Sequence, residues 1–319
     1  MALQLNSATS QVLFTTFSAL FQGAFEKVKT FYQDFCTVMP SQSETQLYHW
    51  IAQIPGMREW IGQRQFNNAV LRDYSLVNKI FEDTISLDKF KVANDQYGAF
   101  GPTVQAFGDS IARWPDQQMA LVVEAAVTAL CYDGQYFFDT DHPVSLTDSS
   151  QGTFSNKLVG ASYNLATDPL GVWQAASELM ASFKGDAGQP LGLVADTLMV
   201  PPSLRRYAMQ AAKSEIVPQT VRNVAGSENV GVAGVSNIYQ GDFNVIVNPY
   251  LSSAACVVMC SNRPVKPFIW QLRQPPVFTP LVDPTLPNMF ERREFVYGSE
   301  AQGAGGYSLP FLAVRCSAA

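Results

Sequence analysis

The stretch CYDGQYFFDTDHPV, from Cys131 to Val144, carries the densest set of side chains that could do chemistry. It holds one cysteine, three aspartates and one of only two histidines. His142 with Asp133, Asp139 and Asp141 could ligate a metal ion, and Asp139, Asp141 and His142 could serve as acid–base groups. The ligand count opposes a metal, because such sites generally use more than one His or Cys ligand and His49 lies far away in sequence. We therefore expect no metal, and a metal-dependent enzyme centred on Asp139, Asp141 and His142 is the weaker alternative.

The same stretch also fits a structural role, as two turns with an aromatic anchor between them. Asp133-Gly134 is a typical turn pair, and the second turn would use its side chains to accept hydrogen bonds from backbone amides. We predict structural turn roles for Asp133, Gly134, Phe137, Phe138, Asp139, His142 and Pro143.

Other reactive patterns are weak. Cys256 and Cys260 have no second ligand pair, and the five scattered cysteines indicate buried free thiols rather than a disulfide framework. There is no nucleophile elbow and no Walker loop. GAGG (303–306) follows a predicted strand but opens no helix, so we expect a flexible turn there. The sequence thus predicts no catalytic residue, no cofactor and no enzyme.

Composition indicates an assembly subunit. The 319 residues are 47% hydrophobic but only 15% charged, against about a quarter in ordinary soluble proteins. A surface this poor in charge is expected where much of it is covered by partners. The net charge of -6 argues against nucleic-acid binding through a basic patch. We expect no membrane contact, because the longest apolar run is short and contains Glu124.

The elements that must position these residues alternate irregularly, so we expect an α+β class. Helices are predicted near 103–113, from Asp116 onward, over 168–184 and after Ser203. Strands are predicted over 195–200, 235–251 and 254–272, and residues 293–316 read as a strand, a glycine-rich loop and a last strand. The first 36 residues carry a helical apolar stripe. It fits either a core helix or, as we prefer, an arm that packs on a neighbouring subunit.

Residues 58–91 are unusually polar, since eleven of these 34 residues are charged. Within them, residues 78–87 show β-strand composition with neither face consistently apolar. A two-stranded ribbon of this kind is marginal alone, so we expect a hairpin that lies on an external surface.

Several phrases resemble the family of Mu-like phage major head subunits of the gpT type. They include LYHWIAQIPGMREWIGQR (47–64), YSLVNKIFEDTISL (74–87), CYDGQYFFDTDHPV and ELMASFKGDAGQPLGL (178–193). RPVKPFIWQLRQPP (263–276) and EFVYGSEAQGAGGYSLPF (294–311) continue the resemblance in the same order. The first 40 residues carry no such phrase.

The resemblance implies a Hong Kong 97-type capsid fold. Residues 1–40 would be an N-terminal arm, and 41–130 the first part of the peripheral domain, with an extended loop at 56–90 and a spine helix at about 103–113. Residues 131–255 would be the axial domain, and 256–319 the strands that return to the peripheral domain.

The implied function is that of a major head protein. Copies would form hexamers and pentamers of an icosahedral shell, assembled in the bacterial host cytoplasm and enclosing double-stranded DNA without binding it specifically. We expect a separate scaffold and protease, a portal and a decoration protein as partners, and no covalent crosslink through Lys79. A head decoration or tail component is the alternative. The candidate contacts between subunits are Phe17, Phe21, Val28, Phe31, Arg58, Trp60, Arg64, Arg72, Asp73, Lys79, Glu82 and Asp83.

Overall fold

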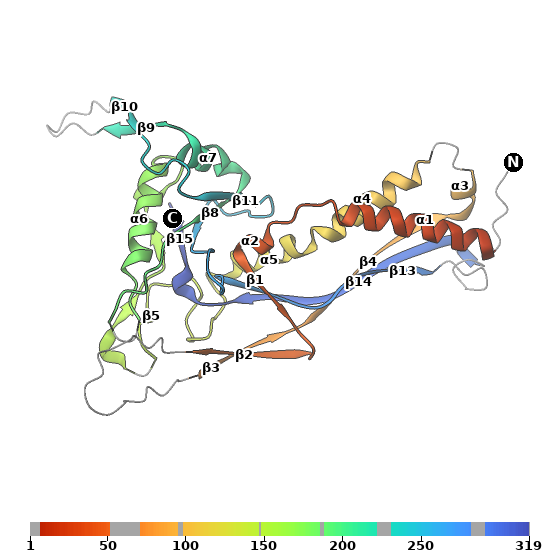
Figure 1. The fold of residues 1–319 in the computed structure, drawn as a ribbon, viewed down its shortest axis with the longest axis horizontal. Coiled ribbons are helices and arrows are strands. Elements are labelled where there is room, and N and C mark those ends of the chain that lie inside the picture. Colours follow the sequence, from red (N-terminus) through yellow and green to blue (C-terminus); the bar gives the residue numbers. More distant parts are fainter. Residues whose placement is uncertain are drawn as a thin grey trace.

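A computed structural model describes residues 7–51, 71–94, 98–146, 148–185, 188–221, 231–281 and 291–318. The molecule has an elongated part, a long sheet with helices along one face, and a compact part around a second sheet (Figure 1). A two-stranded hairpin projects beside the long sheet. Helices and strands are mixed, as an α+β class requires.

The long sheet has the strand order β1-β13-β14-β4. Its centre is the antiparallel pair β13 (Phe268–Leu281) and β14 (Glu294–Tyr307), flanked by the parallel strand β1 (Cys36–Pro40) and the antiparallel strand β4 (Lys79–Asp88). The register of β13 against β14 shifts between Leu272 and Val277. Pro275 and Pro276 lie in that interval and lack the N–H groups a regular ladder needs.

Two consecutive helices, α4 (Phe100–Ala112) and α5 (Trp114–Ala125), run along one face of this sheet (Figure 1). The break before Pro115 is where the sequence predicts it, since proline is tolerated only in the first turn of a helix. Asp116 in that first turn accepts hydrogen bonds from the amides of Phe31 and Tyr32, at 3.1 and 2.8 Å. It thereby holds the short helix α2 (Tyr32–Phe35) against α5.

The N-terminal helix α1 (Ser7–Phe25) packs on α4 within its own chain. Phe17 and Phe21 are buried there, and the Phe21 ring lies 4.6 Å from that of Phe278. The preference for an arm whose stripe packs on a neighbour is therefore wrong for these two residues, because their apolar area is already covered. Residues 32–40 likewise belong to α2 and β1.

Glycine-rich 303–306 is part of strand β14 and not a flexible turn. A Cβ at Gly303 would come within 2.7 Å of the Gln271 carbonyl oxygen, and one at Gly305 within 2.7 Å of Met119 and Val122 on α5. Glycine here allows β13 and α5 to approach the strand closely, which spacing along one segment does not reveal.

The projecting hairpin consists of β2 (Thr45–Ile51) and β3 (Leu71–Val77), paired from Thr45↔Val77 to Ile51↔Leu71. The expectation of a hairpin over 78–87 is wrong, because those residues form β4 and pair with β14. The sequence of β4 shows no consistently apolar face, but Leu87 at its end packs in the apolar cluster beneath α1 and α4. α3 (Lys89–Ala93) follows β4, capped by Asp88.

The compact part contains a five-stranded sheet of order β11-β8-β12-β15-β7. Its strands are β11 (Asn244–Val247), β8 (Thr197–Val200), β12 (Cys256–Met259), β15 (Ala313–Ser317) and β7 (Lys157–Val159). Helices α6 (Pro169–Ser182) and α7 (Arg205–Lys213) pack on it. A boundary at 255/256 therefore cuts through this sheet, and the chain returns to the long sheet only at β13.

Smaller elements complete the compact part. β5 (His142–Pro143) pairs with β6 (Thr153–Phe154), and β9 (Ile216–Val221) with β10 (Gly231–Ser236). Short 3-10 helices lie at Ser149–Gln151, Ala161–Tyr163, Pro202–Leu204 and Pro310–Leu312. Among the described residues, none of the helices combines the length and apolarity that a membrane crossing needs.

Candidate functional site

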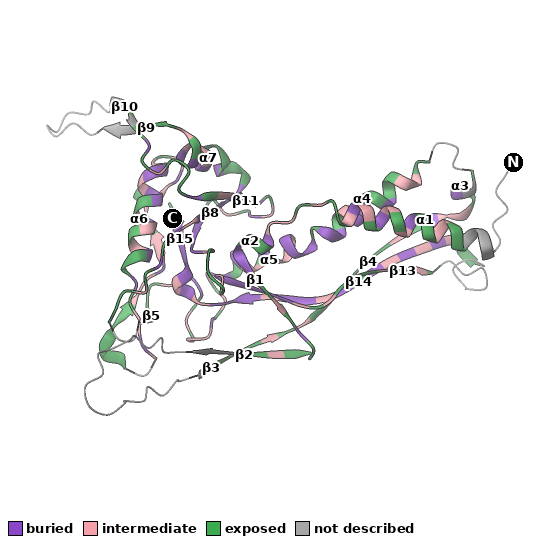
Figure 2. Cartoon of the chain, in the orientation of Figure 1, coloured by how far each residue is buried: buried purple, intermediate pink, exposed green. Residues whose placement is uncertain are grey.

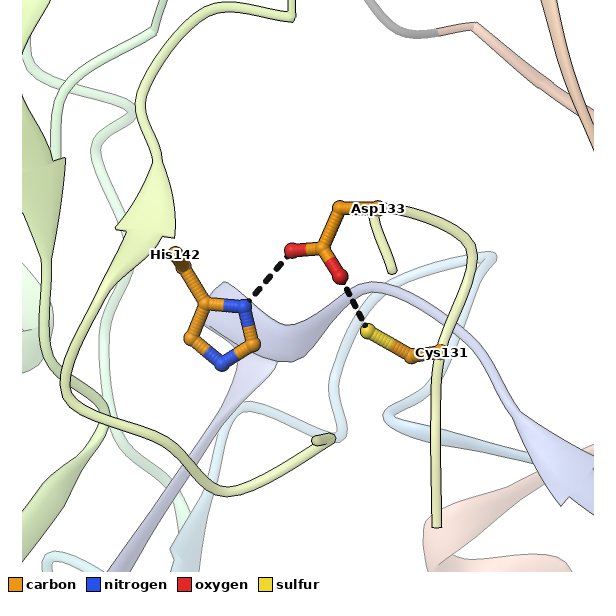
Figure 3. A group of neighbouring side chains, drawn as sticks. All are labelled: Cys131, Asp133 and His142. Carbon is orange, nitrogen blue, oxygen red and sulfur yellow. Dashed lines mark hydrogen bonds and ion pairs between the residues drawn. The ribbon is translucent and has the colours of Figure 1, made fainter. Parts of the chain in front are cut away.

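The stretch from Cys131 to Val144 folds into two turns that bring Cys131, Asp133 and His142 together (Figure 3). Nδ1 of His142 lies 2.6 Å from Oδ2 of Asp133, and the Cys131 thiol donates to Oδ1 at 2.8 Å. The Gln135 amide donates to the same oxygen at 3.0 Å. Gly134 takes a positive φ of 86°, which the tight turn requires and glycine allows.

The cluster is almost closed to solvent, with His142 0% exposed. Burial alone would raise the pKa of Asp133, but hydrogen bonds from His142 and Cys131 outweigh it and lower that pKa. Burial, and next the charge of Asp133, raise the pKa of the Cys131 thiol. The thiol therefore stays protonated and serves as a donor, which is the opposite of what a nucleophile or thiolate ligand needs.

The three side chains are paired with one another through Asp133, and one ring nitrogen of His142 is left over. Both carboxylate oxygens of Asp133 already accept from protein donors. The other ring nitrogen of His142, Nε2, is buried without a hydrogen-bond partner among the described residues, and the ring stacks on Phe154 at 5.1 Å. A metal at Nε2 would therefore lack further donors, and the expectation of no metal stays a prediction.

Asp139 and Asp141 do not join this cluster. Asp139 caps its own turn by accepting from the Thr140 amide at 2.8 Å, and Asp141 is exposed. Phe137 and Phe138 are buried as expected, and the Phe137 ring stacks on Tyr307 at 5.0 Å. Pro143 lies in the short strand β5.

Two residues of the site were missed by sequence reasoning, Cys131 as a member of the cluster and Asn156. Asn156 is fully buried, and its amide donates to the carbonyls of Phe137 and Pro310 at 2.7 and 3.0 Å. Its side-chain oxygen accepts from the Asp139 amide at 2.9 Å. It thus ties the second turn to the segment before β15. A lone asparagine gives no signal in the sequence, because its partners are backbone atoms of distant residues.

The candidate contact residues fall into separate places. Arg58, Trp60 and Arg64 lie outside the described residues. Arg72 and Asp73 belong to β3, where Asp73 is exposed. Lys79, Glu82 and Asp83 are exposed on β4. Val28 and Phe31 are half-buried, and the Phe31 ring stacks on that of Phe35 in α2 at 6.4 Å. Among the described candidates, the exposed side chains of Asp73, Lys79, Glu82 and Asp83 are accessible to another copy.

The chain matches one family model and is similar to known phage head proteins. The family model of the Mu-like prophage major head subunit gpT matches residues 10–170, 159–251 and 252–319. The chain is 26% identical to the major capsid protein of Escherichia phage Mu, over 76% of this chain and 98% of that protein. It is 32% identical to the Mu-like prophage FluMu major head subunit of Haemophilus influenzae, over 52% of each chain.

Solved structures share the fold at lower identity. A chain of the bacteriophage JBD30 procapsid superposes with a TM-score of 0.58 and 24% identity, over 98% of this chain and 75% of that one. A virus-like particle from Pyrococcus furiosus gives a TM-score of 0.55 at 9% identity, over 96% and 99% of the two chains. Both likenesses concern the fold, which is of the Hong Kong 97 type.

Proposed function

Because the chain belongs to the family of Mu-like prophage major head subunits (gpT), it is a major capsid protein, and we propose that its copies build hexamers and pentamers of a closed icosahedral head. Family membership also decides between the alternatives that the sequence leaves open. The chain is a head subunit, and neither an enzyme nor a tail or decoration protein.

The observation that carries the assembly proposal is the uncovered face of the long sheet. Along the far half of β13 (burial classes in Figure 2), half-buried residues alternate with exposed ones. Val277 and Leu281 there remain 44% and 45% exposed. A sheet that covers one face with its own helices and leaves apolar residues on the other is suited to contact with further copies.

The parts of the molecule support a domain assignment of the same kind. We assign the long sheet with α4 and α5 to the peripheral domain, and the β2–β3 hairpin to the extended loop. The five-stranded sheet with α6 and α7 would be the axial domain. The exposed charges of β4 and the hairpin, including Lys79, Glu82 and Asp83, would fix register between neighbours more than affinity.

Partners follow from the same proposal. We propose that a separate scaffold and protease, a portal and a decoration protein act with the head subunit. The head would assemble in the host cytoplasm and enclose double-stranded DNA. The net charge of -6 suits a container that holds DNA without adhering to it.

The test is assembly of the purified full chain, alone and co-expressed with scaffold candidates, followed by sedimentation and negative-stain microscopy. We expect rings, shells or tubes. A species that stays monomeric under all these conditions would contradict the proposal. Lys79→Glu should impair assembly and leave the subunit folded, while Lys184→Glu, at an exposed site in the compact part, controls for the same charge change.

A further inference from the structure

We propose that Gln271 is a positioning residue that fixes the direction in which the β2–β3 hairpin leaves the body, and that this direction determines the size uniformity of the shell. The inference rests on the assembly proposed above. It adds a specific buried residue that controls how a subunit meets its neighbours.

The chain leaves the body and returns to it at two points that are tied to each other. It leaves through the turn Ser41–Glu44 after β1, and it returns through Asn78 between β3 and β4. The Asn78 amide donates to the Glu44 carbonyl at 2.9 Å. The Asn78 side chain donates to Ser41 Oγ at 2.9 Å and to the Ser43 carbonyl at 2.8 Å. The base of the hairpin is therefore closed.

Gln271 on β13 connects this closed base to the long sheet. The side chain is 0% exposed. Its Nε2 donates to Asn78 Oδ1 at 2.7 Å and to the Leu76 carbonyl at 3.4 Å. Its Oε1 accepts from the Tyr48 hydroxyl at 2.7 Å. One buried amide thus contacts β2, β3 and the connection to β4.

Hydrogen bonds suit this task because they weaken steeply as their angles change, whereas apolar contacts tolerate sliding. Burial, with a contribution from Tyr74, raises the pKa of Tyr48 to about 12, so the hydroxyl remains a donor. A buried network with every member paired specifies one arrangement, and a broken one is costly.

Packing alone does not hold the hairpin on both sides. On one side β3 lies close to β14, where a Cβ at Gly306 would come within 3.0 Å of Leu76 and 3.2 Å of Tyr74. On the other side a groove of about 390 Å3 separates Leu76 and Val77 from Leu121 on α5. The groove leaves room for the hairpin base to move, and the Gln271 network opposes that movement.

The first experiment compares Gln271→Met with Gln274→Met. Methionine has the length of glutamine without its polar groups, and Gln274 is a half-buried residue on the same strand that donates to Glu300 at 3.2 Å. Spin labels at Ser75→Cys on β3 and Gln105→Cys on α4 report the hairpin direction in dissociated subunits, since both sites are exposed and the native cysteines are buried. We expect one narrow distance peak in the parent and in Gln274→Met, and a peak at least twice as broad in Gln271→Met.

The second readout is the shell. We expect a single diameter by electron microscopy for the parent and Gln274→Met, and mixed diameters or open sheets for Gln271→Met. Tyr48→Phe removes only one hydroxyl and should give intermediate broadening, which keeps the test available if Gln271→Met does not fold. An unchanged label distance in both variants would overturn the proposal.

A third variant tests whether the Gln271 network sets the hairpin direction or only stabilises the subunit. Tyr48→Phe/Gln271→Met removes both members of the buried hydroxyl–amide pair and keeps the Asn78 bonds to Ser41 and Ser43, so the melting temperature should recover part of the loss seen in Gln271→Met. We expect broad label distances to persist. Recovery of narrow distances and uniform shells would show that the network acts only through stability. If the parent forms no shells at all, the assembly proposal fails, while the label distances still decide whether Gln271 sets the hairpin direction.

Discussion

The two sheets of this molecule differ in how completely their strands are buried. In the compact part, every residue of β8 and β12 is buried, whereas β13 of the long sheet is buried at its first four residues and then alternates between half-buried and exposed. A strand buried at every position has both faces covered, and an alternating strand has one. The compact part is thus completed by its own chain, while the long sheet leaves a face for others.

The compact sheet is covered from two sides by separate clusters. Leu198, Val258 and Val314 pack with α6 and α7, in the cluster that contains Trp173. Their neighbours Met199, Val257 and Ala313 pack on the opposite side, in the cluster that contains Phe137 and Phe138. The aromatic turn and the helices therefore cover opposite faces of one sheet. Substitutions in either cluster should therefore lower the stability of the subunit.

The largest effect is expected for Trp173→Ala. Its ring is 1% exposed and stacks on Phe243 with centroids 3.7 Å apart. Truncating it should lower the free energy of unfolding of the subunit by about 3–5 kcal/mol, because a large cavity forms beneath the sheet. Urea unfolding of subunits, followed by circular dichroism, measures the loss. A loss below about 1 kcal/mol would mean that the compact part does not depend on this cluster.

Sequence reasoning succeeded where the signal is local. Asp168 caps α6 by accepting from the Gly171 amide at 2.9 Å, and Pro115 separates α4 from α5. Caps and proline breaks depend on residues within one turn, so a single segment suffices to predict them. The buried double turn with Phe137 and Phe138 was predicted for the same reason.

The failures concern pairings across long stretches of chain. The β4 strand looked like half of a hairpin because its partner β14 lies more than 200 residues later, from Glu294↔Asp88 to Gly303↔Lys79. Glycine-rich 303–306 looked like a loop because the atoms that need the space belong to β13 and α5. The stripe of α1 could serve a core or a neighbour equally well, and only the position of α4 decides.

The candidate site also combines local turns, which the sequence predicts, with contacts between distant residues, which it does not. The turn residues from Asp133 to His142 were recognisable as turns, but the bond between these two side chains depends on how both turns fold. Asn156 escaped notice because its partner, the Pro310 carbonyl, is 154 positions away.

A second, moderate effect contrasts two buried aspartates, one in each part. The folded state lowers the pKa of Asp133, so the stability it contributes is present above the ordinary aspartate pKa and is lost as the pH falls through the lowered value. Burial raises the pKa of Asp116, so its folded form binds a proton more readily and the contribution has the opposite sign. Stability from Asp116 falls as the pH rises through the interval between the ordinary and the raised value.

Two matched substitutions test that contrast. Asp133→Asn should lower the free energy of unfolding at pH 7 and reduce its decline in acid, because the amide nitrogen that replaces one carboxylate oxygen cannot accept a hydrogen bond, so either the bond to His142 or the bonds from Cys131 and Gln135 are lost. Asp116→Asn should be neutral or stabilising at pH 7, since a single Oδ1 already accepts both amide bonds. Urea unfolding at several pH values distinguishes the two. If the free energy of unfolding changed with pH in the same way in both variants, the two aspartates would not contribute with opposite signs.

The smallest effect on the subunit, and the clearest on assembly, is expected for Val277→Ser. Val277 lies on the uncovered face of β13, and a surface substitution of this kind should change the free energy of unfolding by no more than about 0.5 kcal/mol. The adjacent Phe278 points to the opposite face, where it stacks on Tyr297 at 5.5 Å, so Phe278→Ala should cost about 3 kcal/mol. If the uncovered face is an interface, Val277→Ser shells should dissociate at lower urea than the parent while the subunit melts normally. Shells as resistant as the parent's would place the interface elsewhere, and the incomplete burial of the long sheet would then need a partner other than a second copy.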